Sequence, residues 1–222
     1  GENDSWEALR VVSTTGEREG GIPLTLEKAV ELAVVPGEPR SDELSPEAQV
    51  FFDLLNGAID RSIVPDLTLY VHGANNNFYR ASAQASQFRH FTGNNSVVMV
   101  YAWPSAESIL RYAVDVENAK KTVPVFARLL ELLAEHSKAR YIHILAYSAG
   151  PQILSPALAH LRRQHEEEDI QQLKDRLRLG EIYYAAPDVD FKVFFEDMAT
   201  YIDLPEHVTL ALNPNDSVLA FS

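Results

Sequence analysis

The chain has 222 residues, 46% hydrophobic and 23% charged, which is enough for one sizeable α/β domain with a buried core. Its formal net charge of −13 excludes nucleic acid as an expected partner, because a phosphate backbone would be repelled. The absence of cysteine excludes disulfides and a cysteine nucleophile. The longest apolar run, 97–103, is far shorter than the roughly 20 residues of a membrane-spanning helix, so no transmembrane segment is expected.

The first part of the chain, residues 1–64, is acidic and contains scattered glycine and proline around two short amphipathic stretches. These stretches are 26–34 and 45–55, and the second begins with a Ser-Pro pair that suits a helix N-cap and first turn. We interpret residues 1–64 as an acidic N-terminal segment of unassigned role, with its charges on a solvated surface.

From residue 65 onward, continuous apolar runs alternate with stretches of helical periodicity. This alternation predicts a mostly parallel sheet covered by helices on both faces. Residues 65–222 are therefore predicted to form a three-layer α/β domain. The expected strands are 67–71, 97–103, 141–147, 182–186 and 208–212, and the expected helices are 80–90, 119–136, 150–165 and 169–179.

The segment 143–150 has the pattern of a nucleophile elbow. An apolar run ends at Tyr147, Ser148 follows with a small residue two positions away on each side, and a helical stretch begins at once. Such a turn exposes the serine hydroxyl at the carboxyl end of a strand, and the small residues are needed because the two backbones nearly touch. The usual pattern is G-x-S-x-G, and here Ala146 replaces the first glycine. Ser148 is the candidate nucleophile.

The loop after the first strand, 72–77, has the layout of an oxyanion loop. His72 and Gly73 follow the strand and lead through polar residues to a helix. We expect the backbone N–H of Ala74 to face the negative charge of a tetrahedral intermediate, with the N–H of Ala149 as its partner. Taken alone, these residues also fit an ordinary turn rich in Asn and Gly. The serine elbow downstream favours the oxyanion loop.

Carboxylates follow the last two expected strands, and one of them is predicted to orient the catalytic histidine. Asp216 lies in the turn-rich loop after the fifth strand and is preferred, because the chain order of such hydrolases is serine, acid, histidine. Asp188 and Asp190, after the fourth strand, are the alternatives. For both Asp188 and Asp190, the non-catalytic explanation is that the carboxylate caps the helix that begins near Phe191.

None of the seven histidines is well placed to act as the base. His72 belongs to the oxyanion loop, and His143 lies within the strand before Ser148, where a buried, hydrogen-bonded core residue is expected. His207 precedes the fifth strand, at the wrong edge of the sheet. The other four fall on or at the ends of helices. We therefore expect the base on a further segment after Asp216, formed by one more helix, a last strand and a histidine loop.

Four regions together resemble a family of bacterial α/β-hydrolases of unknown function in the esterase/lipase superfamily, over about residues 65–222. The family motifs are V-H-G-x-N-x-x-F, W-P-S with a later Tyr and Asp, I-H-I-L-A-H-S-M-G, and A-P-D with a later S-x-x-D-x-A-L. Their counterparts here are 71–78, 103–105 with Tyr112 and Asp115, 142–150, and 186–188 with 213–219. The resemblance implies Ser148 as nucleophile and Asp216 as acid. It also implies oxyanion donors at Ala74 and Ala149, and a catalytic histidine several tens of residues after the acid.

These patterns predict a serine hydrolase that cleaves a small-molecule carboxylic ester through an acyl-enzyme. The expected substrate pocket comprises His72, Asn75, Trp103 and Tyr147, the last in place of the family's histidine. No cofactor or metal is expected, since the phosphate-binding glycine motifs and metal-binding histidine pairs are missing from the sequence. The alternative is a non-catalytic binding protein of the same fold that lacks the histidine. The polar start and the resemblance favour an exported bacterial protein over a cytoplasmic one.

Overall fold

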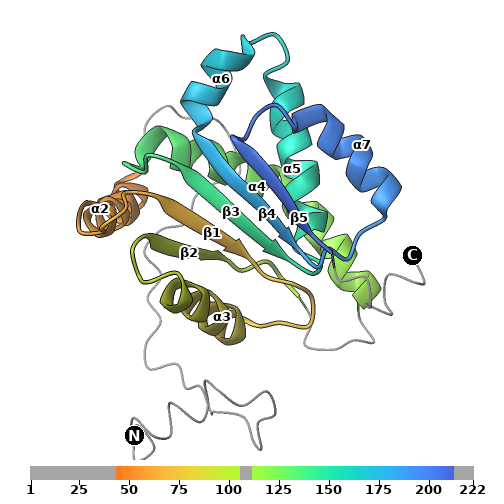
Figure 1. The fold of residues 1–222 in the computed structure, drawn as a ribbon, viewed down its shortest axis with the longest axis horizontal. Coiled ribbons are helices and arrows are strands. Elements are labelled where there is room, and N and C mark those ends of the chain that lie inside the picture. Colours follow the sequence, from red (N-terminus) through yellow and green to blue (C-terminus); the bar gives the residue numbers. More distant parts are fainter. Residues whose placement is uncertain (1–43, 106–111, 213–222) are drawn as a thin grey trace, which may run out of the picture.

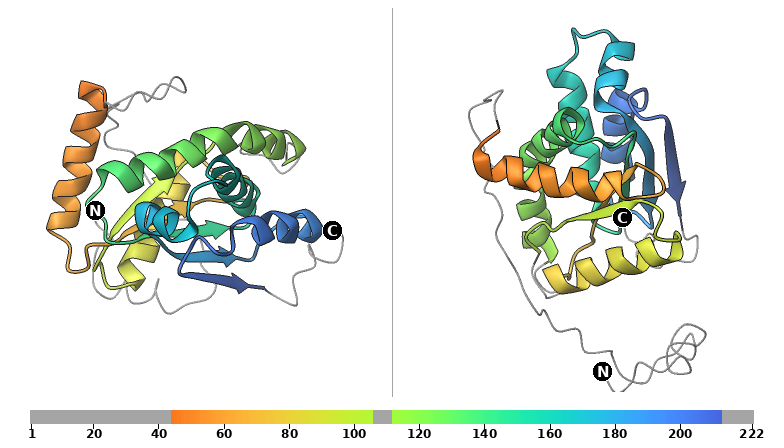
Figure 2. Two further views of the ribbon diagram at one scale, coloured as in Figure 1. Left: turned by 90° about the horizontal axis from the view of Figure 1, so that it is seen from above. Right: turned by 90° about the vertical axis from the view of Figure 1, so that its left-hand side faces the viewer.

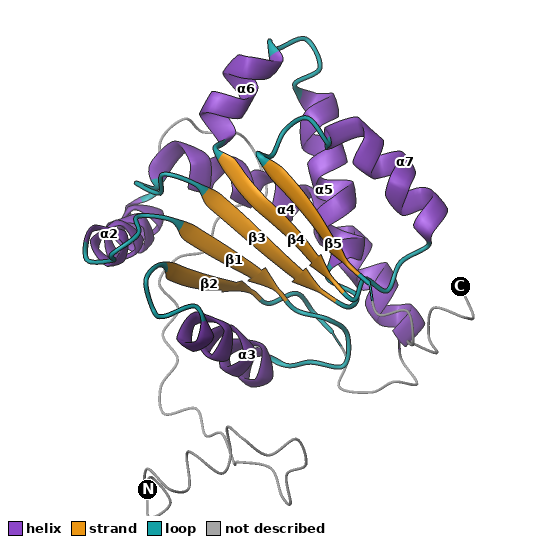
Figure 3. Cartoon of the chain, in the orientation of Figure 1, coloured by secondary structure: helices purple, strands orange, loops and turns teal. Residues whose placement is uncertain are grey.

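A five-stranded parallel sheet is the framework of the chain (Figure 1 and Figure 3). The structure is a computed structural model that describes residues 44–105 and 112–212. The strands lie in the order β2-β1-β3-β4-β5, so β3 is central and carries the candidate nucleophile at its carboxyl end. The parallel sheet with its intervening helices confirms the predicted α/β class. The strands are β1 Leu67–Val71, β2 Val97–Tyr101, β3 Ile142–Tyr147, β4 Leu179–Ala185 and β5 His207–Ala211.

The helices that connect the strands pack beside the sheet (Figure 2). Connections between parallel strands are right-handed, so the reversal of direction after β2 places α3 on the opposite face from α4 and α5. Among the described residues, none of the helices combines the length and apolar composition that crossing a bilayer requires. The helices are α2 Pro46–Asp60, α3 Phe78–Phe91, α4 Tyr112–His136, α5 Pro151–Gln164, α6 Ile170–Leu177 and α7 Phe191–Tyr201.

Short polar side chains begin several of these helices by satisfying their first free N–H groups. The Ser45 hydroxyl accepts a hydrogen bond from the N–H of Ala48 and starts α2, with Pro46 in the first turn as the Ser-Pro pair predicts. Asn77 caps α3 and Asp169 caps α6 in the same way. The expected amphipathic stretch 45–55 is thus the first part of α2, whereas 26–34 lies outside the described residues.

The chain leaves α6 and enters β4 earlier than the sequence pattern predicts. Arg178 has a φ of 50°, a left-handed conformation that ends the helix, and its N–H donates to the carbonyl of Lys174 at 2.8 Å. β4 begins at the next residue. Gly180 permits this pairing, because a Cβ there would lie 2.6 Å from the His143 ring. The predicted helix 169–179 and strand 182–186 are therefore wrong at their shared boundary.

The alternation of side chains along β3 determines where the core lies. Ile142, Ile144 and Ala146 are at most 1% exposed and belong to a core cluster that includes residues of α4 and α5. Tyr147 and Tyr183 lie on the other face of the sheet, where they remain exposed in the described structure. The core is thus concentrated on one side of the sheet and fixes the central strand from that side.

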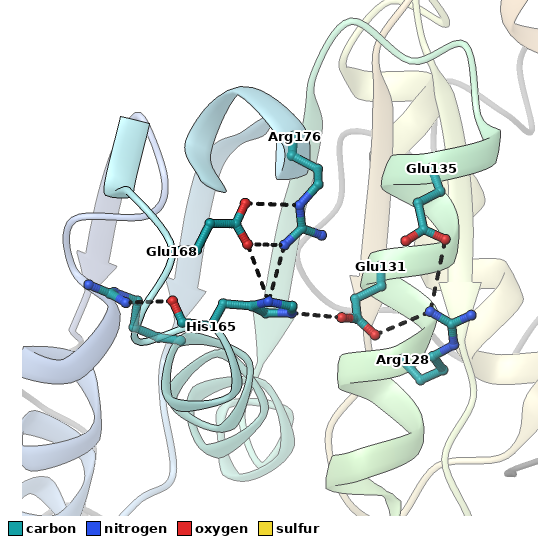
Figure 4. Close-up of polar contacts among 7 residues, drawn as sticks. Arg128, Glu131, Glu135, His165, Glu168 and Arg176 are labelled. Atoms are coloured by element: carbon teal, nitrogen blue, oxygen red, sulfur yellow. Dashed lines mark hydrogen bonds and ion pairs between the residues drawn. The ribbon is translucent and has the colours of Figure 1, made fainter. Parts of the chain in front are cut away.

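A polar network joins α4 to the segment between α5 and α6 (Figure 4). Nε2 of His165 lies 2.9 Å from Oε1 of Glu131, and Nη1 of Arg128 lies 3.3 Å from the other oxygen of the same carboxylate. On the far side of the His165 ring, Arg176 donates two hydrogen bonds to Glu168, at 3.2 and 2.8 Å, which lower the pKa of that carboxyl. The network ties the last turn of α6 and the segment before α6 to the buried side of α4.

Candidate active site

Ser148 occupies a strained turn between β3 and α5. Its φ is 53°, in the left-handed region, which costs a residue other than glycine about 1–2 kcal/mol. Neighbouring backbone holds the turn in place: the N–H of Ser148 donates to the carbonyl of Ala185 at 3.0 Å, and its carbonyl accepts from the N–H of Asp188 at 2.8 Å. Both partners come from the end of β4 or from the loop after it. The elbow therefore depends on the adjacent strand as well as on its own sequence.

The small residues around Ser148 are required by close backbone contacts. A Cβ on Gly150 would lie only 2.6 Å from the carbonyl oxygen of Val71 at the end of β1. The methyl group of Ala146 is fully buried and is accommodated at the position where the usual elbow has glycine. The contact that demands glycine thus lies after the serine, and the departure at Ala146 does not disturb the turn.

The loop after β1 lies directly beside the serine side chain. β1 and β3 are neighbours in register, with Val71 opposite Ala146, so the residues after both strand ends meet. A Cβ on Gly73 would lie 2.9 Å from Cβ of Ser148 and 3.3 Å from its Oγ. The structure therefore brings the predicted nucleophile and the predicted oxyanion loop together, at the carboxyl edge of the sheet.

His72 supports this loop from beneath. His72 is 1% exposed. Its ring stacks on the Trp103 ring, with 5.1 Å between the ring centroids and 7° between the ring planes. Nδ1 of His72 lies 2.7 Å from the carbonyl of Gly73, and the Trp103 indole N–H donates to the carbonyl of His72 at 2.7 Å. Burial lowers the pKa of His72, although its two backbone contacts oppose that effect. A neutral, stacked imidazole in this position fixes the loop.

The remaining loop residues are held by hydrogen bonds to α3 and to the segment after β2. Asn76 donates through its side chain to Gln84 at 2.8 Å, and its backbone N–H and carbonyl both contact the Ser105 hydroxyl, at 3.1 and 3.0 Å. Among the described residues, the N–H groups of Ala74 and Ala149 both lack a backbone acceptor in the turns, loops and caps.

The predicted pocket side chains differ widely in exposure. His72 and Trp103 are buried, and their rings stack on each other. Tyr147 is 44% exposed, and Asn75 is exposed with a φ of 52°. Tyr147 and Asn75 therefore lie on the surface, whereas His72 and Trp103 are buried and stabilise the loop after β1.

The candidate acids have different surroundings. Asp190 caps α7, because its Oδ1 accepts the N–H groups of Lys192 and Val193 at 2.9 and 3.2 Å. Asp188 lies next to the elbow, with its N–H bonded to Ser148 and its carbonyl accepting from the side chain of Gln152 at 2.7 Å. Asp216, the preferred acid, lies outside the described residues, as do the side chains of Tyr112 and Asp115.

All seven histidines lie in the described part of the chain, and none of them forms a hydrogen bond with Ser148 there. His143 accepts the N–H of Glu181 at Nδ1, at 2.9 Å, and its Nε2 lies 3.4 Å from Asp66. Its side chain is 30% exposed because it lies on the exposed face of β3, so the expected burial is wrong, whereas the expected hydrogen bonding is confirmed. His207 begins β5, at the amino edge of the sheet, as expected.

Two features of this region were not anticipated from the sequence. A cavity of about 230 Å³ lies behind the elbow, between α5 and α7. Buried hydroxyls of Tyr184, Tyr201 and Ser155 form a chain beside it, at 2.6 and 2.9 Å. Isolated Tyr and Ser positions on three separate elements give no sequence signal of such a chain. Within the described ranges, no group of three or more His, Asp or Glu side chains is arranged to hold a metal ion.

Comparison with known proteins identifies one family. The sequence profile of a family described as alpha/beta hydrolase of unknown function matches residues 50–222, which covers the sheet, its helices and the elbow. The match confirms the suspected resemblance and extends its start from residue 65 into α2. A search of the curated proteins found no match to the chain.

Proposed function

The chain belongs to this family of α/β-hydrolases of unknown function, and on that premise we propose that it is a serine hydrolase that cleaves a small carboxylic ester through an acyl-enzyme on Ser148. The left-handed conformation of Ser148 is the observation that carries the proposal. A serine held in this conformation at the end of a central strand, beside a loop with available N–H groups, is the arrangement that acyl transfer requires.

In the proposed reaction, Oγ of Ser148 attacks the ester carbonyl carbon while a histidine takes the hydroxyl proton. The carbonyl oxygen becomes an oxyanion and accepts hydrogen bonds from the N–H groups of Ala74 and Ala149. The carbonyl then re-forms, the bond to the alcohol oxygen breaks, and the histidine returns its proton to the leaving alkoxide. Water repeats these steps on the acyl-enzyme and releases the carboxylic acid.

We propose Asp216 as the acid that orients this histidine, with the histidine following it in the chain as the family pattern implies. Asp190 is less suited to the role, because its carboxylate is already bound to the first turn of α7. Asp188 is the alternative, since its backbone contacts Ser148 directly.

A second candidate function is binding without catalysis. It is favoured by the fact that no histidine in the described residues forms a hydrogen bond with Ser148. In this reading, the elbow and the loop bind a small ester or acid, and no covalent intermediate forms.

Turnover of a short-chain nitrophenyl ester by the full-length protein separates the two functions. We expect saturable hydrolysis that falls by at least about 10³-fold in Ser148→Ala, because the nucleophile is removed. Ser86→Ala is the matched control, since Ser86 is exposed on α3 and, among the described residues, its hydroxyl donates only to the carbonyl of Ser82. Equal rates in wild type and Ser148→Ala would refute the enzymatic proposal and leave the binding function.

A further inference from the structure

The loop between Gly73 and α3 is anchored on Asn76, two residues after the proposed oxyanion donor Ala74. Asn76 is buried, and its backbone N–H donates to the Ser105 hydroxyl at 3.1 Å, which in turn donates to the Asn76 carbonyl at 3.0 Å. Its side chain reaches α3, because Nδ2 donates to Oε1 of Gln84 at 2.8 Å. The position of Ala74 therefore depends on what holds Asn76.

A backbone group sets the direction of each side-chain hydrogen bond in this anchor. The N–H of Asn77 donates to Oδ1 of Asn76 at 3.0 Å, which leaves the Asn76 Nδ2 group facing α3. Nδ2 can only donate, so Gln84 must turn its oxygen toward it. Tyr70 meets the same oxygen at 3.1 Å and must therefore donate as well. Oε1 of Gln84 is thus a shared acceptor for two donors.

Tyr70 is suited to remain a donor in this arrangement. It belongs to β1 and is buried, and its side chain reaches Gln84 of α3. Burial, together with the nearby phenol of Tyr147, raises the pKa of Tyr70 to about 12, so the hydroxyl keeps its proton at neutral pH. Two buried donors from different segments, β1 and the loop after it, therefore converge on one side-chain oxygen of α3.

The rest of α3 supplies little apolar packing that could hold the loop instead. The buried residues of this helix are Ala81 and Ala85, whose small side chains bury little apolar area. Gln84 lies between them and is exposed as a residue, although its oxygen contacts two buried groups. Removal of that oxygen would leave the Tyr70 hydroxyl and the Asn76 amide without this acceptor, a costly state for buried donors.

We propose that Gln84 is a positioning residue of the Ser148 site. By accepting from both Asn76 and Tyr70, it fixes the oxyanion loop so that the N–H of Ala74 faces the developing oxyanion. Gln84 acts through Asn76 and does not touch the substrate, and its role rests on the proposed function of Ser148. Because an oxyanion donor acts mainly in the transition state, its displacement lowers kcat and leaves KM unchanged.

Two substitutions of Gln84 separate its acceptor oxygen from its bulk. Gln84→Met removes the oxygen at similar volume, whereas Gln84→Glu keeps an oxygen that accepts from both donors. In the full-length protein, Gln84→Met should lower kcat for the nitrophenyl ester about 10–100-fold, less than the roughly 10²–10³-fold that outright loss of an oxyanion donor costs. KM should stay the same, and Gln84→Glu should retain most of the wild-type kcat. Gln87→Met is the matched control, since Gln87 is exposed one turn later on α3.

A second readout of the same variants does not depend on catalysis. Amide hydrogen exchange of the segment 72–77, measured by mass spectrometry, should be about tenfold faster in Gln84→Met than in the wild type, because the loop opens more readily without its anchor. Gln84→Glu and Gln87→Met should exchange at the wild-type rate.

Three results would overturn the proposal. Equal exchange in Gln84→Met and Gln87→Met means that Gln84 does not hold the loop. A loss of kcat in Gln84→Glu as large as that in Gln84→Met means that the shared acceptor is not the cause. A higher KM at constant kcat in Gln84→Met means that Gln84 affects substrate binding instead. A wild type without Ser148-dependent hydrolysis refutes the proposed function itself, whereas the anchor stands or falls by the exchange result alone.

Discussion

At the scale of single residues, the geometry of the candidate site depends on positions where neighbouring atoms leave no room for a side chain. Ser148 holds a left-handed conformation that most residues avoid, and the glycines at 73 and 150 let the end of β1 and the loop after it approach the elbow closely. The strain at Ser148 is offset by hydrogen bonds to the end of β4 and the loop after it. The geometry of the nucleophile is therefore a property of three strand ends together.

Gly150→Ala is predicted to destabilise the fold by about 1–3 kcal/mol, because the new Cβ would meet the carbonyl of Val71 at 2.6 Å and force the backbones apart. Urea unfolding of the two proteins measures the difference. Gly57→Ala is the matched control: Gly57 lies inside α2, and among the described residues a Cβ there would approach Nη1 at the end of the Arg61 side chain, at 3.3 Å. That variant should gain about 0.5–1 kcal/mol from helix propensity. Equal effects of both substitutions would contradict the proposed close contact.

Asp216→Asn should reduce turnover of the nitrophenyl ester by about 10⁴-fold, as loss of the orienting acid does in hydrolases with the same triad. The same substitution should leave the unfolding midpoint almost unchanged, which separates a catalytic effect from a structural one. Unchanged turnover would transfer the role to Asp188 or Asp190.

Asp66 is predicted to contribute to acid sensitivity. Burial acts to raise its pKa, but hydrogen bonds from Arg140 at 3.0 and 2.9 Å and the contact with His143 outweigh this and lower it. A carboxyl whose pKa is lower in the folded state adds stability above its unfolded pKa of about 4, and that stability is lost as the pH falls through the folded pKa. Asp66→Asn should therefore flatten the decline of unfolding free energy below about pH 4. Curves that stay parallel over this range would show that Asp66 is not responsible.

At the scale of elements, helix positions follow from packing and from buried polar contacts. The carboxylate of Glu131 is 4% exposed, and it joins His165 and Arg128 across the gap between α4 and α5. Replacement by a neutral amide removes a charged acceptor and leaves a donor group facing these partners, a change worth about 1–3 kcal/mol.

Glu131→Gln should accordingly lower the free energy of unfolding by that amount, measured by chemical denaturation at neutral pH. Glu135→Gln, one turn later on the same helix, is the control. Its side chain is 40% exposed, and its closest approach to Arg128 is 3.9 Å, so it should change stability by less than about 0.5 kcal/mol. A smaller effect at position 131 than at 135 would rule out the structural role of the network.

The elements most easily predicted from sequence are those with a strong local pattern. An apolar run preceded by Pro65 and followed by the His-Gly turn predicts a strand at 67–71, and β1 has these bounds. The boundary of α6 and β4 was not predictable, because Arg178 gives no local sign of a left-handed conformation. That conformation follows from the pairing of β4 with β3, a contact between segments far apart in the chain.

At the scale of the whole molecule, parallel strand order gathers the site from distant segments. The sequence alone was enough to predict the elbow and the loop as partners, because the carboxyl ends of parallel strands share one edge. The sequence was not enough to distinguish residues that line a substrate pocket from residues that support the loop after β1. His72 and Trp103 have the composition of binding residues, and only their stacking and burial show that they hold the loop. The cavity behind the elbow was also missed, since it arises from the packing of α5 against α7.

The claim that Ser148 is a nucleophile is tested most directly by reaction of the full-length protein with a fluorophosphonate probe, followed by peptide sequencing. Ser148 and Ser155 share the tryptic peptide 141–162, so fragmentation must assign the modified serine. We predict a single label on Ser148, abolished in Ser148→Ala and retained in Ser86→Ala. A wild-type protein that stays unlabelled while a known serine hydrolase reacts, or a label that persists in Ser148→Ala, would contradict the account.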